Sequence, residues 1–351
     1  MKMLAPKVSI IILNWNGWRD TIECLESLYR IDYPNYDVIV VDNGSTDDST
    51  QKIKQYAEGK IQVNSKFFEY TPGNKPIKVF EITEEEAKHG KFNRLLYEKF
   101  DPDRRMILIK SKRNQGFTGG NNIGIKFALS ILASKYVLLL NNDIVVDRSF
   151  LKDLVNLARK DKTVGIVGSL VRFYNSQEVQ SAGIKLNLKS GRIYHLKTYN
   201  EREQSLDCVM GCSMLISKDA LLGSGLFDNV FFAYTEEIDL CLRVKSNGYL
   251  INLSPTSVVF HKHRGSTGYK INGFILFHRS RNYLLMIYKL FRSKWVLLTT
   301  PYLLNIIGEA ILWSFTQKDI SLLISTINGI SSALKLIIKG YPNEMGDFYK
   351  S

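Results

Sequence analysis

Short runs of consecutive aliphatic residues recur through most of the chain, and each ends abruptly in a cluster of small polar residues. Such runs, unbroken by polar positions, are typical of strands that are buried on both faces of a sheet. Segments with apolar residues at helical spacing lie between them. The alternation of strand and helix predicts a doubly wound α/β sheet. The expected strands cover residues 8–13, 36–41, 106–109, 136–140 and 164–171.

Two stretches depart from this alternation. Between about 58 and 105 the periodicity is lost, and a candidate strand at 77–82 is followed by a candidate helix start at Glu84. We interpret this stretch as an insertion about the size of a hairpin and a helix. The alternation over 180–195 predicts a hairpin.

The pattern changes again beyond about residue 273. Basic residues, among them Arg281 and Lys289, interleave with large apolar residues as far as about Lys294. This spacing predicts a basic amphipathic helix, which is suited to an anionic membrane surface.

Two apolar segments follow, at 295–315 and 320–338. The first has about the length that spans a bilayer, although Pro301 and Glu309 interrupt it. We expect these segments to lie on, enter or cross a membrane; the alternative is a soluble helical subdomain or an interface in a homo-oligomer. The predicted domain boundary falls between 1–272 and 273–351.

Composition narrows the possible partners. The chain has 351 residues, 45% of them hydrophobic, and a formal net charge of +13. This charge indicates an anionic partner: nucleic acid, an acidic membrane surface or a phosphorylated substrate. We exclude nucleic acid because the basic residues accompany the apolar C-terminal segment and form no stacking motif. The four cysteines lack metal-ligand spacing, and with no signal peptide in sight we expect reduced thiols in a cytosolic chain.

The first candidate for chemistry follows the strand at 136–140. Asn141, Asn142 and Asp143 come directly after it. In an open α/β sheet, ligands bind at the carboxyl ends of the strands. A carboxylate beside two amides suits Mg²⁺ or Mn²⁺ that is also held by a substrate phosphate. The alternative is a simple turn.

The second candidate is the glycine-rich stretch 114–122, which we expect to form a loop before a helix that begins near Ile123. Glycines at such a place allow the backbone to approach a phosphate, and a helix N-terminus favours negative charge. The alternative is a flexible turn.

The third candidate is acidic. Glu236, Glu237 and Asp239 fall within four positions, with aromatic residues just before them. Carboxylates so close repel one another, and in a partly buried cleft this raises at least one pKa toward that of a useful base. The alternative is a solvated acidic helix start, stabilised by the helix dipole.

A histidine after a strand is the fourth candidate. His261 is either a structural residue, a neutral ligand of the same cation or a pH-sensitive contact to phosphate. Lys262 and Arg264 add positive charge where a diphosphate would lie.

These motifs, taken in the order in which they occur along the chain, resemble those of the family 2 glycosyltransferases of the GT-A fold, in the branch often called rhamnosyltransferase-like. The resemblance covers about three quarters of the chain. The matching segments are 11–17, 40–47, 114–122, 140–143 and 235–240, and His261 with Gly265-Ser266-Thr267.

The resemblance implies a role for particular residues. Asp143 corresponds to the metal-binding carboxylate of the family's Asp-X-Asp motif, whose first position is Asn141 here, and His261 completes the metal site. Glu237 corresponds to the catalytic base, with Glu236 and Asp239 as alternatives. The residues implied in nucleotide-sugar binding are Leu13, Asn14, Asn16, Asp42, Asn43, Gly44, Asn114, Gly116, Phe117, Asn121 and Asn142.

The implied activity is transfer of a sugar, with inversion, from a nucleotide-diphosphate sugar to a hydroxyl of a glycan or lipid-linked acceptor. The implied cofactor is Mn²⁺ or Mg²⁺, and the implied place is the cytoplasmic face of the cell membrane. A sugar nucleotidyltransferase is an alternative, but that class prefers a basic glycine-rich loop directly after the first strand, where this chain has Asn14-Trp15-Asn16-Gly17. The other alternative is a catalytically inactive scaffold that only binds sugar nucleotides.

Overall fold

The computed structural model describes residues 5–199, 206–262 and 271–340. Its main sheet is built from strands β1 (Val8–Asn14), β2 (Tyr36–Asp42), β3 (Lys78–Thr83), β4 (Arg105–Lys110), β5 (Tyr136–Asn141), β6 (Ile144–Val146), β7 (Val164–Phe173), β8 (Val179–Ser181), β11 (Ser213–Ser217) and β12 (Leu250–His261). The order across the sheet is β3-β4-β2-β1-β5-β11-β7-β12-β6, and β8 pairs with β7. Each of the five strands expected from the sequence is present.

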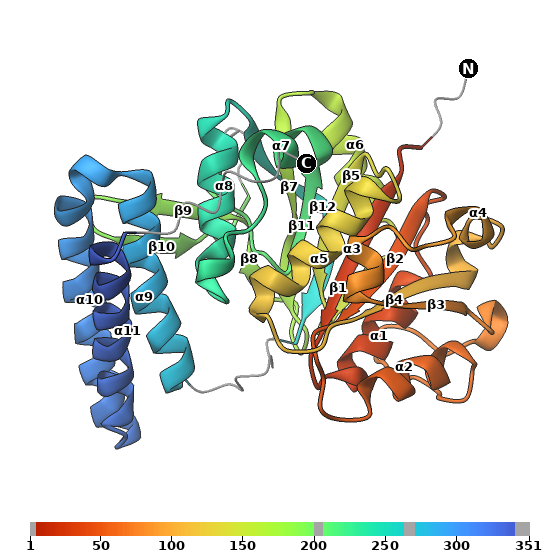
Figure 1. The fold of residues 1–351 in the computed structure, drawn as a ribbon, viewed down its shortest axis with the longest axis horizontal. Coiled ribbons are helices and arrows are strands. Elements are labelled where there is room, and N and C mark those ends of the chain that lie inside the picture. The colour runs from red at the N-terminus through yellow and green to blue at the C-terminus, as the bar shows by residue number, and fades with distance from the viewer. Residues whose placement is uncertain (1–4, 200–205, 263–270, 341–351) are drawn as a thin grey trace.

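Helices cover both faces of this sheet (Figure 1). The bounds are α1 (Trp18–Leu28), α2 (Ser49–Ala57), α3 (Glu84–Lys88), α4 (Arg94–Tyr97), α5 (Gly116–Ser130), α6 (Phe150–Lys160), α7 (Lys218–Ser224), α8 (Glu236–Ser246), α9 (Gly273–Leu290), α10 (Trp295–Gln317) and α11 (Ser321–Ile338). Helices α1, α2 and α6 share one hydrophobic core, whereas α5, α7, α8 and α9 share the core on the opposite face.

The central strands are buried on both sides, which explains their unbroken apolar sequence. In β1, Ile10 and Ile12 point into one core and Ile11 into the other. Strands β1, β2, β4 and β5 run parallel. Their carboxyl ends therefore meet at one edge of the sheet, where Asn14 pairs in register with Asp42 and Leu13 with Asn141.

The sheet is mixed rather than wholly parallel. Strand β11 runs antiparallel to both of its neighbours, β5 and β7, and the short β6 runs antiparallel to β12. The mixed α/β sheet agrees with the fold class expected from the family resemblance.

The stretch 58–105 contains the expected strand, as β3, and the expected helix start, as α3 with Thr83 and Glu86 forming a capping box. Strand β3 pairs parallel with β4 and extends the sheet at its edge. A hairpin does form where it was predicted near 180–195, from β9 (Ile184–Asn187) and β10 (Arg192–His195).

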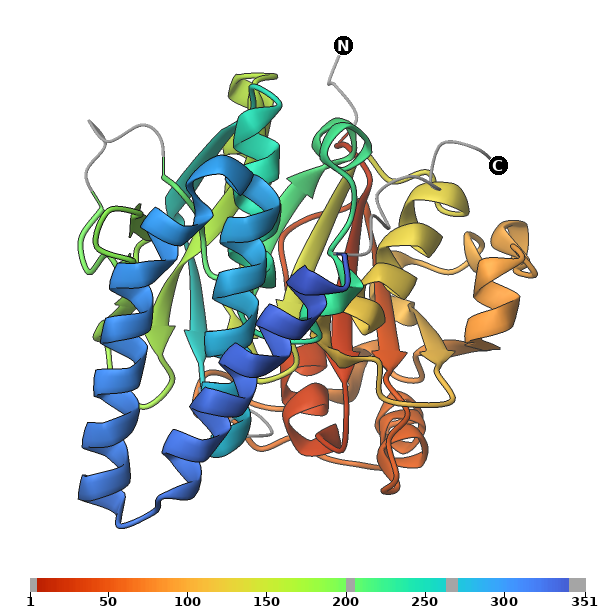
Figure 2. The same ribbon diagram turned by 60° about the vertical axis from the view of Figure 1, so that its left-hand side comes forward.

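The three C-terminal helices lie side by side next to the sheet (Figures 1 and 2). Helix α9 buries one face in the core that it shares with α5 and α8. Helices α10 and α11 are long and apolar enough to cross a membrane, and each is only 22% buried over its most hydrophobic window. These two helices, at the positions of the predicted apolar segments, could associate with a membrane.

The prediction that the basic residues of α9 face a membrane is wrong for Lys289. Its Nζ lies 2.8 Å from Asp228 Oδ2 and 3.1 Å from Asp239 Oδ1, and the side chain is nearly buried. Two carboxylates in the protein core therefore draw this lysine inward, away from any membrane.

Candidate active site

Asp143 and His261 are brought together by two short pieces of sheet. Asp143 lies between β5 and β6, and the antiparallel pairing of β6 with β12 places His261 opposite Ile144. His261 Nε2 is 3.3 Å from Asp143 Oδ1, and both side chains are nearly buried. One carboxylate and one imidazole thus lie side by side, although they come from segments that are far apart in the sequence.

Gln180, which the sequence did not single out, orients this histidine. Its Oε1 lies 2.9 Å from His261 Nδ1, and the glutamine is itself buried. If Nδ1 carries the proton and donates it to Gln180, Nε2 has its lone pair directed toward Asp143. Holding the far nitrogen in this way is how proteins commonly fix a metal-binding histidine.

The positive charge expected beside the diphosphate is largely neutralised in the case of Lys262. Its Nζ lies 2.5 Å from both Asp20 Oδ1 and Glu23 Oε2 on α1. This lysine therefore ties β12 to α1. Arg264 and Gly265-Ser266-Thr267 lie outside the residues that the structure describes.

A buried polar network links the ends of β1 and β2. Asn14 Nδ2 donates to Asp42 Oδ1 at 2.8 Å, and Thr21 Oγ1 donates to Asn14 Oδ1 at 2.8 Å. Asp42 also accepts from the hydroxyl and the backbone N–H of Ser45. Asn14 and Asp42 therefore fix the shapes of the loops after both strands.

Asn43 connects this network to the glycine-rich stretch. Its Nδ2 donates to Asn114 Oδ1 at 2.9 Å and to the carbonyl of Gly116 at 3.0 Å. Gly44 has a φ of +72°, and a Cβ there would lie 2.5 Å from the backbone of Arg113. Only glycine allows the two loops to approach so closely.

The expected glycine-rich loop is mostly helix, because α5 already begins at Gly116. A Cβ on Gly120 would lie 2.3 Å from Leu13 Cδ1, and one on Gly124 would lie 2.7 Å from Ile11 Cγ2. These glycines let α5 pack tightly against β1. The N-terminus of α5 consequently lies at the carboxyl edge of the sheet, where a helix dipole favours an anion.

The other predicted nucleotide-sugar residues border the same edge. Asn16 is exposed and accepts from the backbone N–H of Thr46, and Asn142 Nδ2 donates to Thr21 Oγ1. Asn121 is buried, and its side-chain amide donates to the backbone carbonyl of Phe117, the residue that follows Gly116 in α5. Trp15 was not predicted as a site residue, yet it is 40% exposed at the end of β1 and offers a flat apolar surface there.

Glu236 and Glu237 open α8 in an environment that disfavours charge. Burial raises the pKa of Glu237, and burial together with the charge of Glu237 raises the pKa of Glu236 well above its ordinary value. Oε2 of each has no hydrogen-bond partner among the described residues. The interpretation as a solvated helix start therefore does not fit this pair.

The third acidic candidate is placed differently. Asp239 is fully buried, and Oδ2 accepts from Arg243 Nε at 2.9 Å while Lys289 lies on its other side. These contacts connect α8 to α9 and leave the carboxylate surrounded by cations.

The backbone just before Glu236 is strained. Phe232, Tyr234 and Thr235 have φ values of +63°, +66° and +77°, which non-glycine residues rarely adopt. Asn282 of α9, which the sequence did not single out, holds this loop: its Nδ2 lies 2.8, 2.7 and 2.8 Å from the carbonyls of Phe231, Ala233 and Tyr234. Strained backbone held by surrounding contacts is found mostly at functional sites.

The acidic loop also touches the start of α5. The backbone N–H of Thr118 donates to the carbonyl of Phe232 at 3.2 Å. A Cβ on Gly211, just before β11, would lie 3.4 Å from Glu237 Cβ and 3.9 Å from Phe117 Cζ. Glu237 therefore lies beside the N-terminal turn of α5, at the same edge of the sheet as the polar loops.

Two relatives illustrate what this chain is similar to. It is 27% identical over 154 residues to the low-salt glycan biosynthesis hexosyltransferase Agl10 of Haloferax volcanii, covering 43% of this chain and 49% of the relative. It is 24% identical over 285 residues to the uncharacterized protein y4gI of Sinorhizobium fredii, covering 76% of this chain and 25% of the relative. The chain thus spans about half the length of the first relative and a quarter of the second.

Solved structures share the fold. The mannosyltransferase PcManGT of Pyrobaculum calidifontis, in complex with GDP-Man and Mn²⁺, aligns with a TM-score of 0.56 at 15% identity over 95% of this chain and 88% of its own. GalNAc-T7 with UDP, GalNAc and Mn²⁺ aligns with a TM-score of 0.59 at 12% identity over 97% and 59%. The family model of glycosyltransferase-like family 2 matches residues 6–275. The chain therefore belongs to glycosyltransferase family 2.

Proposed function

We propose that this glycosyltransferase transfers a sugar with inversion from a nucleotide-diphosphate sugar, using Glu237 as the base and a divalent cation at Asp143 and His261. The observation that carries the proposal is the position of Glu237. Its side chain is half-buried, its carboxyl group has a raised pKa, and it lies beside the N-terminal turn of α5 where the donor's phosphates would bind.

The base has a defined task in such a reaction. As the acceptor oxygen bonds to the anomeric carbon and the carbon–oxygen bond to the diphosphate breaks, the proton of the acceptor hydroxyl passes to Glu237. A carboxylate whose pKa is raised by burial is a stronger base for this step. Glu237 is half-buried, so an acceptor can reach it, whereas Glu236 is buried and Asp239 is enclosed by Arg243 and Lys289.

The residues present fit a divalent cation. Asp143 and His261 supply one carboxylate oxygen and one imidazole nitrogen, and Gln180 already holds the far ring nitrogen. Among the described residues no third His, Cys, Asp or Glu joins them, so the diphosphate oxygens and water would supply the other ligands. The mixed oxygen and nitrogen set favours Mn²⁺ over Mg²⁺. When bound, the cation would stabilise the negative charge of the departing diphosphate.

The donor and acceptor follow from the resemblance and the C-terminal helices. The motif set resembles the rhamnosyltransferase-like branch, which favours a hexosyl or deoxyhexosyl donor. Helices α10 and α11 could hold the enzyme at a membrane, and this favours a lipid-linked glycan as acceptor on the cytoplasmic face. The polar loops around Asn14, Asp42 and Asn43 would shape the site for the nucleotide, with Trp15 available for stacking on the base.

The test is hydrolysis of a panel of UDP-, dTDP- and GDP-sugars by the purified protein with Mn²⁺, Mg²⁺ or EDTA. We expect cation-dependent release of nucleoside diphosphate from one donor, lost in Asp143→Ala. Glu237→Gln should lower transfer to an acceptor by about 10²–10⁴-fold. Asp147→Asn is the matched control, because Asp147 is exposed and caps the turn before α6. No turnover and no cation-dependent nucleotide binding would favour an inactive scaffold instead.

A further inference from the structure

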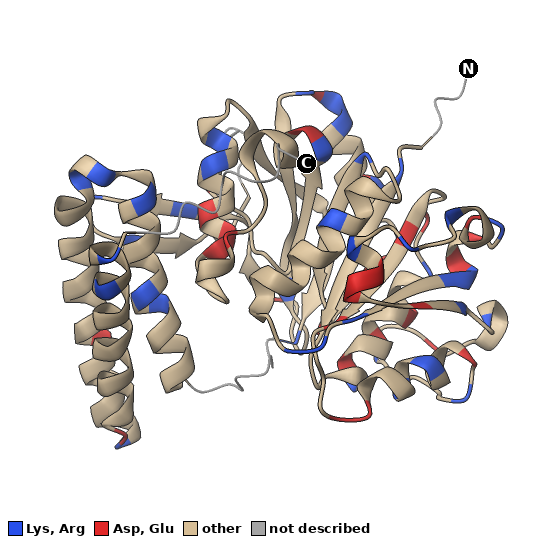
Figure 3. Ribbon diagram, in the orientation of Figure 1, with Lys and Arg blue, Asp and Glu red and all other residues tan. Residues whose placement is uncertain are grey.

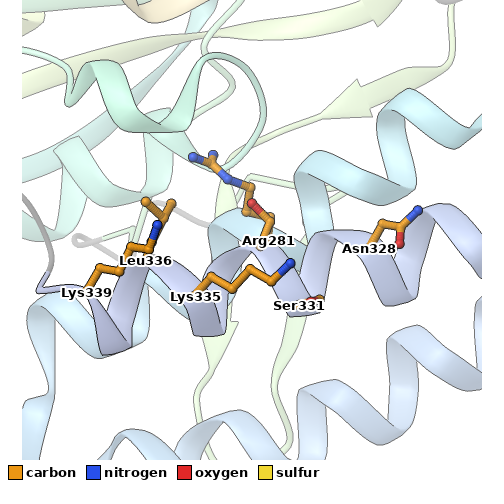
Figure 4. A pocket seen from close by; sticks show the side chains of 7 residues that line it. Arg281, Asn328, Ser331, Lys335, Leu336 and Lys339 are labelled. Atoms are coloured by element: carbon orange, nitrogen blue, oxygen red, sulfur yellow. The ribbon is translucent and has the colours of Figure 1, made fainter.

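A cavity of about 500 Å³ lies between α9 and α11, on the C-terminal part of the chain. Figure 4 shows its side chains: Arg281 comes from α9, and the others come from α11 and its last capping residue, Lys339. Six of them are basic or polar, namely Arg281, Asn328, Ser331, Ser332, Lys335 and Lys339, and the seventh, Leu336, is apolar. The volume is within the range of small-molecule sites.

The cavity carries an excess of positive charge. Among the residues that the structure describes, neither Lys335 nor Lys339 forms an ion pair, and none of those that line the cavity is acidic. Asn328 and the two serines add hydrogen-bond donors. Three cations and several neutral donors around one space recognise an anion with many acceptor oxygens.

The cavity lies at the basic end of an apolar hairpin, whose other end, the turn between α10 and α11, carries Lys318 and Asp319. Between Trp295 and Gln317 the only charged residue is Glu309, and between Ser321 and Ile338 the only one is Lys335. Lys335 lies one helical turn before the end of α11. It is about 21 Å along the helix from the short connection between α10 and α11. Arg292 and Lys294 come just before α10 and therefore lie at this end of the antiparallel pair. Figure 3 shows basic residues at the end of the helices where α9 joins α10.

The cavity also adjoins the loop that leads to the proposed base. Arg281 Nη1 donates to the carbonyl of Val230 at 2.7 Å, and its neighbour Asn282 holds the carbonyls that follow. An anion in this cavity would lie against the same turn of α9 that positions the residues before Glu236.

We propose that the cavity binds the diphosphate of a lipid-linked acceptor, at the level of the membrane headgroups. Three cations match the charge of a diphosphate better than that of a single phosphodiester, and a lipid tail would continue along the exposed apolar side of α10 and α11. This proposal rests on the proposed function for its link to catalysis, but binding itself requires no turnover.

The test measures binding of the full chain to phosphatidylcholine vesicles that contain either a polyisoprenyl diphosphate or phosphatidylglycerol, matched in surface charge. We expect tighter binding to the diphosphate vesicles than to the others. Lys335→Gln/Lys339→Gln should bind the diphosphate vesicles about 30-fold more weakly, from roughly fivefold for each lysine near the surface. Lys152→Gln/Lys160→Gln, which removes two exposed lysines from α6, should bind as the wild type does. Inorganic pyrophosphate should compete only weakly.

Three results would overturn the proposal. Equal binding to both kinds of vesicle would mean that the basic residues respond to surface charge alone. Unchanged binding in the Lys335/Lys339 variant would place the lipid elsewhere. Displacement by inorganic pyrophosphate as effective as by the lipid would mean that the cavity takes a free anion. Each is distinct from failure of the transferase proposal, which would appear as absent donor turnover with the vesicle binding intact.

Discussion

Asn282 offers the sharpest test of how the proposed base, Glu237, is positioned. Substitution by alanine removes a side chain that is fully buried and whose Nδ2 lies within 2.8 Å of three carbonyls in the loop before Glu236. The amide has two hydrogens for these carbonyls. A buried group left without its partner costs about 1–3 kcal/mol, so the free energy of unfolding should fall by about 2–4 kcal/mol.

The effect on activity should exceed the effect of instability. Phe232, Tyr234 and Thr235 are held at positive φ, at a cost of about 1–3 kcal/mol each, and without Asn282 the loop can relax toward ordinary backbone angles. Glu237 follows this loop directly, so its carboxylate should shift. A shift of about 1 Å at a reacting group costs about 10²-fold in kcat.

The assay compares kcat and the donor KM of Asn282→Ala at a temperature where urea unfolding shows the variant to be fully folded. We expect the fall in kcat to exceed any change in the donor KM, because the loops proposed to bind the nucleotide follow β1 and β2, whereas the loop before Glu236 touches α5 at Thr118. The control is Asn305→Ala, which removes one hydrogen bond from α10 to the carbonyl of Ser190 and should cost about 1 kcal/mol without changing kcat. A folded Asn282→Ala enzyme with wild-type kcat would refute the positioning role.

Three further substitutions test other parts of the site. Glu236→Gln should raise the free energy of unfolding at neutral pH. Because the pKa of Glu236 is raised in the folded protein, the wild type is most stable below the ordinary glutamate pKa and loses stability as the pH rises through the pKa of the folded state. Glutamine does not titrate, so the variant lacks this loss. Urea unfolding at several pH values should show the difference growing with pH; a constant difference would contradict the burial argument. Lys289→Met should lower the free energy of unfolding by about 3–5 kcal/mol, because two buried carboxylates lose their cation, and a loss below about 1 kcal/mol would contradict this. Gln180→Leu should weaken Mn²⁺ binding, measured by calorimetry, by about 10–100-fold because His261 loses its orienting partner; unchanged affinity would place the cation elsewhere.

The strands could be predicted from the sequence because each is buried on both faces, and such burial produces an unbroken apolar run that ends at Asn, Asp or Gly. The glycines at 116–124 predict a loop, since glycine is unfavourable within a helix. Here the close approach of α5 to Leu13 and Ile11 requires them, and only the packed structure reveals this.

The site could be predicted in part. Asp143 and His261 are identified by the order of motifs, but their contact depends on the pairing of β6 with β12, which no local pattern specifies. Gln180 and Asn282 escape prediction because a single amide in a polar strand or an apolar helix carries no signal of its own. The charge of Lys289 indicates a membrane-facing surface, whereas the carboxylates that bury it are 61 and 50 residues away in the chain.

The contacts made by α9 determine where this enzyme can be shortened. Deleting apolar helices is a common way to obtain a protein that needs no detergent, and the family match, which ends at residue 275, suggests a cut there. That cut would remove Asn282 from the strained loop and Lys289 from two buried carboxylates. A chain that ends after Leu290 keeps both and loses only the apolar hairpin. Helix α9 therefore belongs to the smallest unit that keeps this loop in place, and it links the apolar hairpin to the residues just before the proposed base.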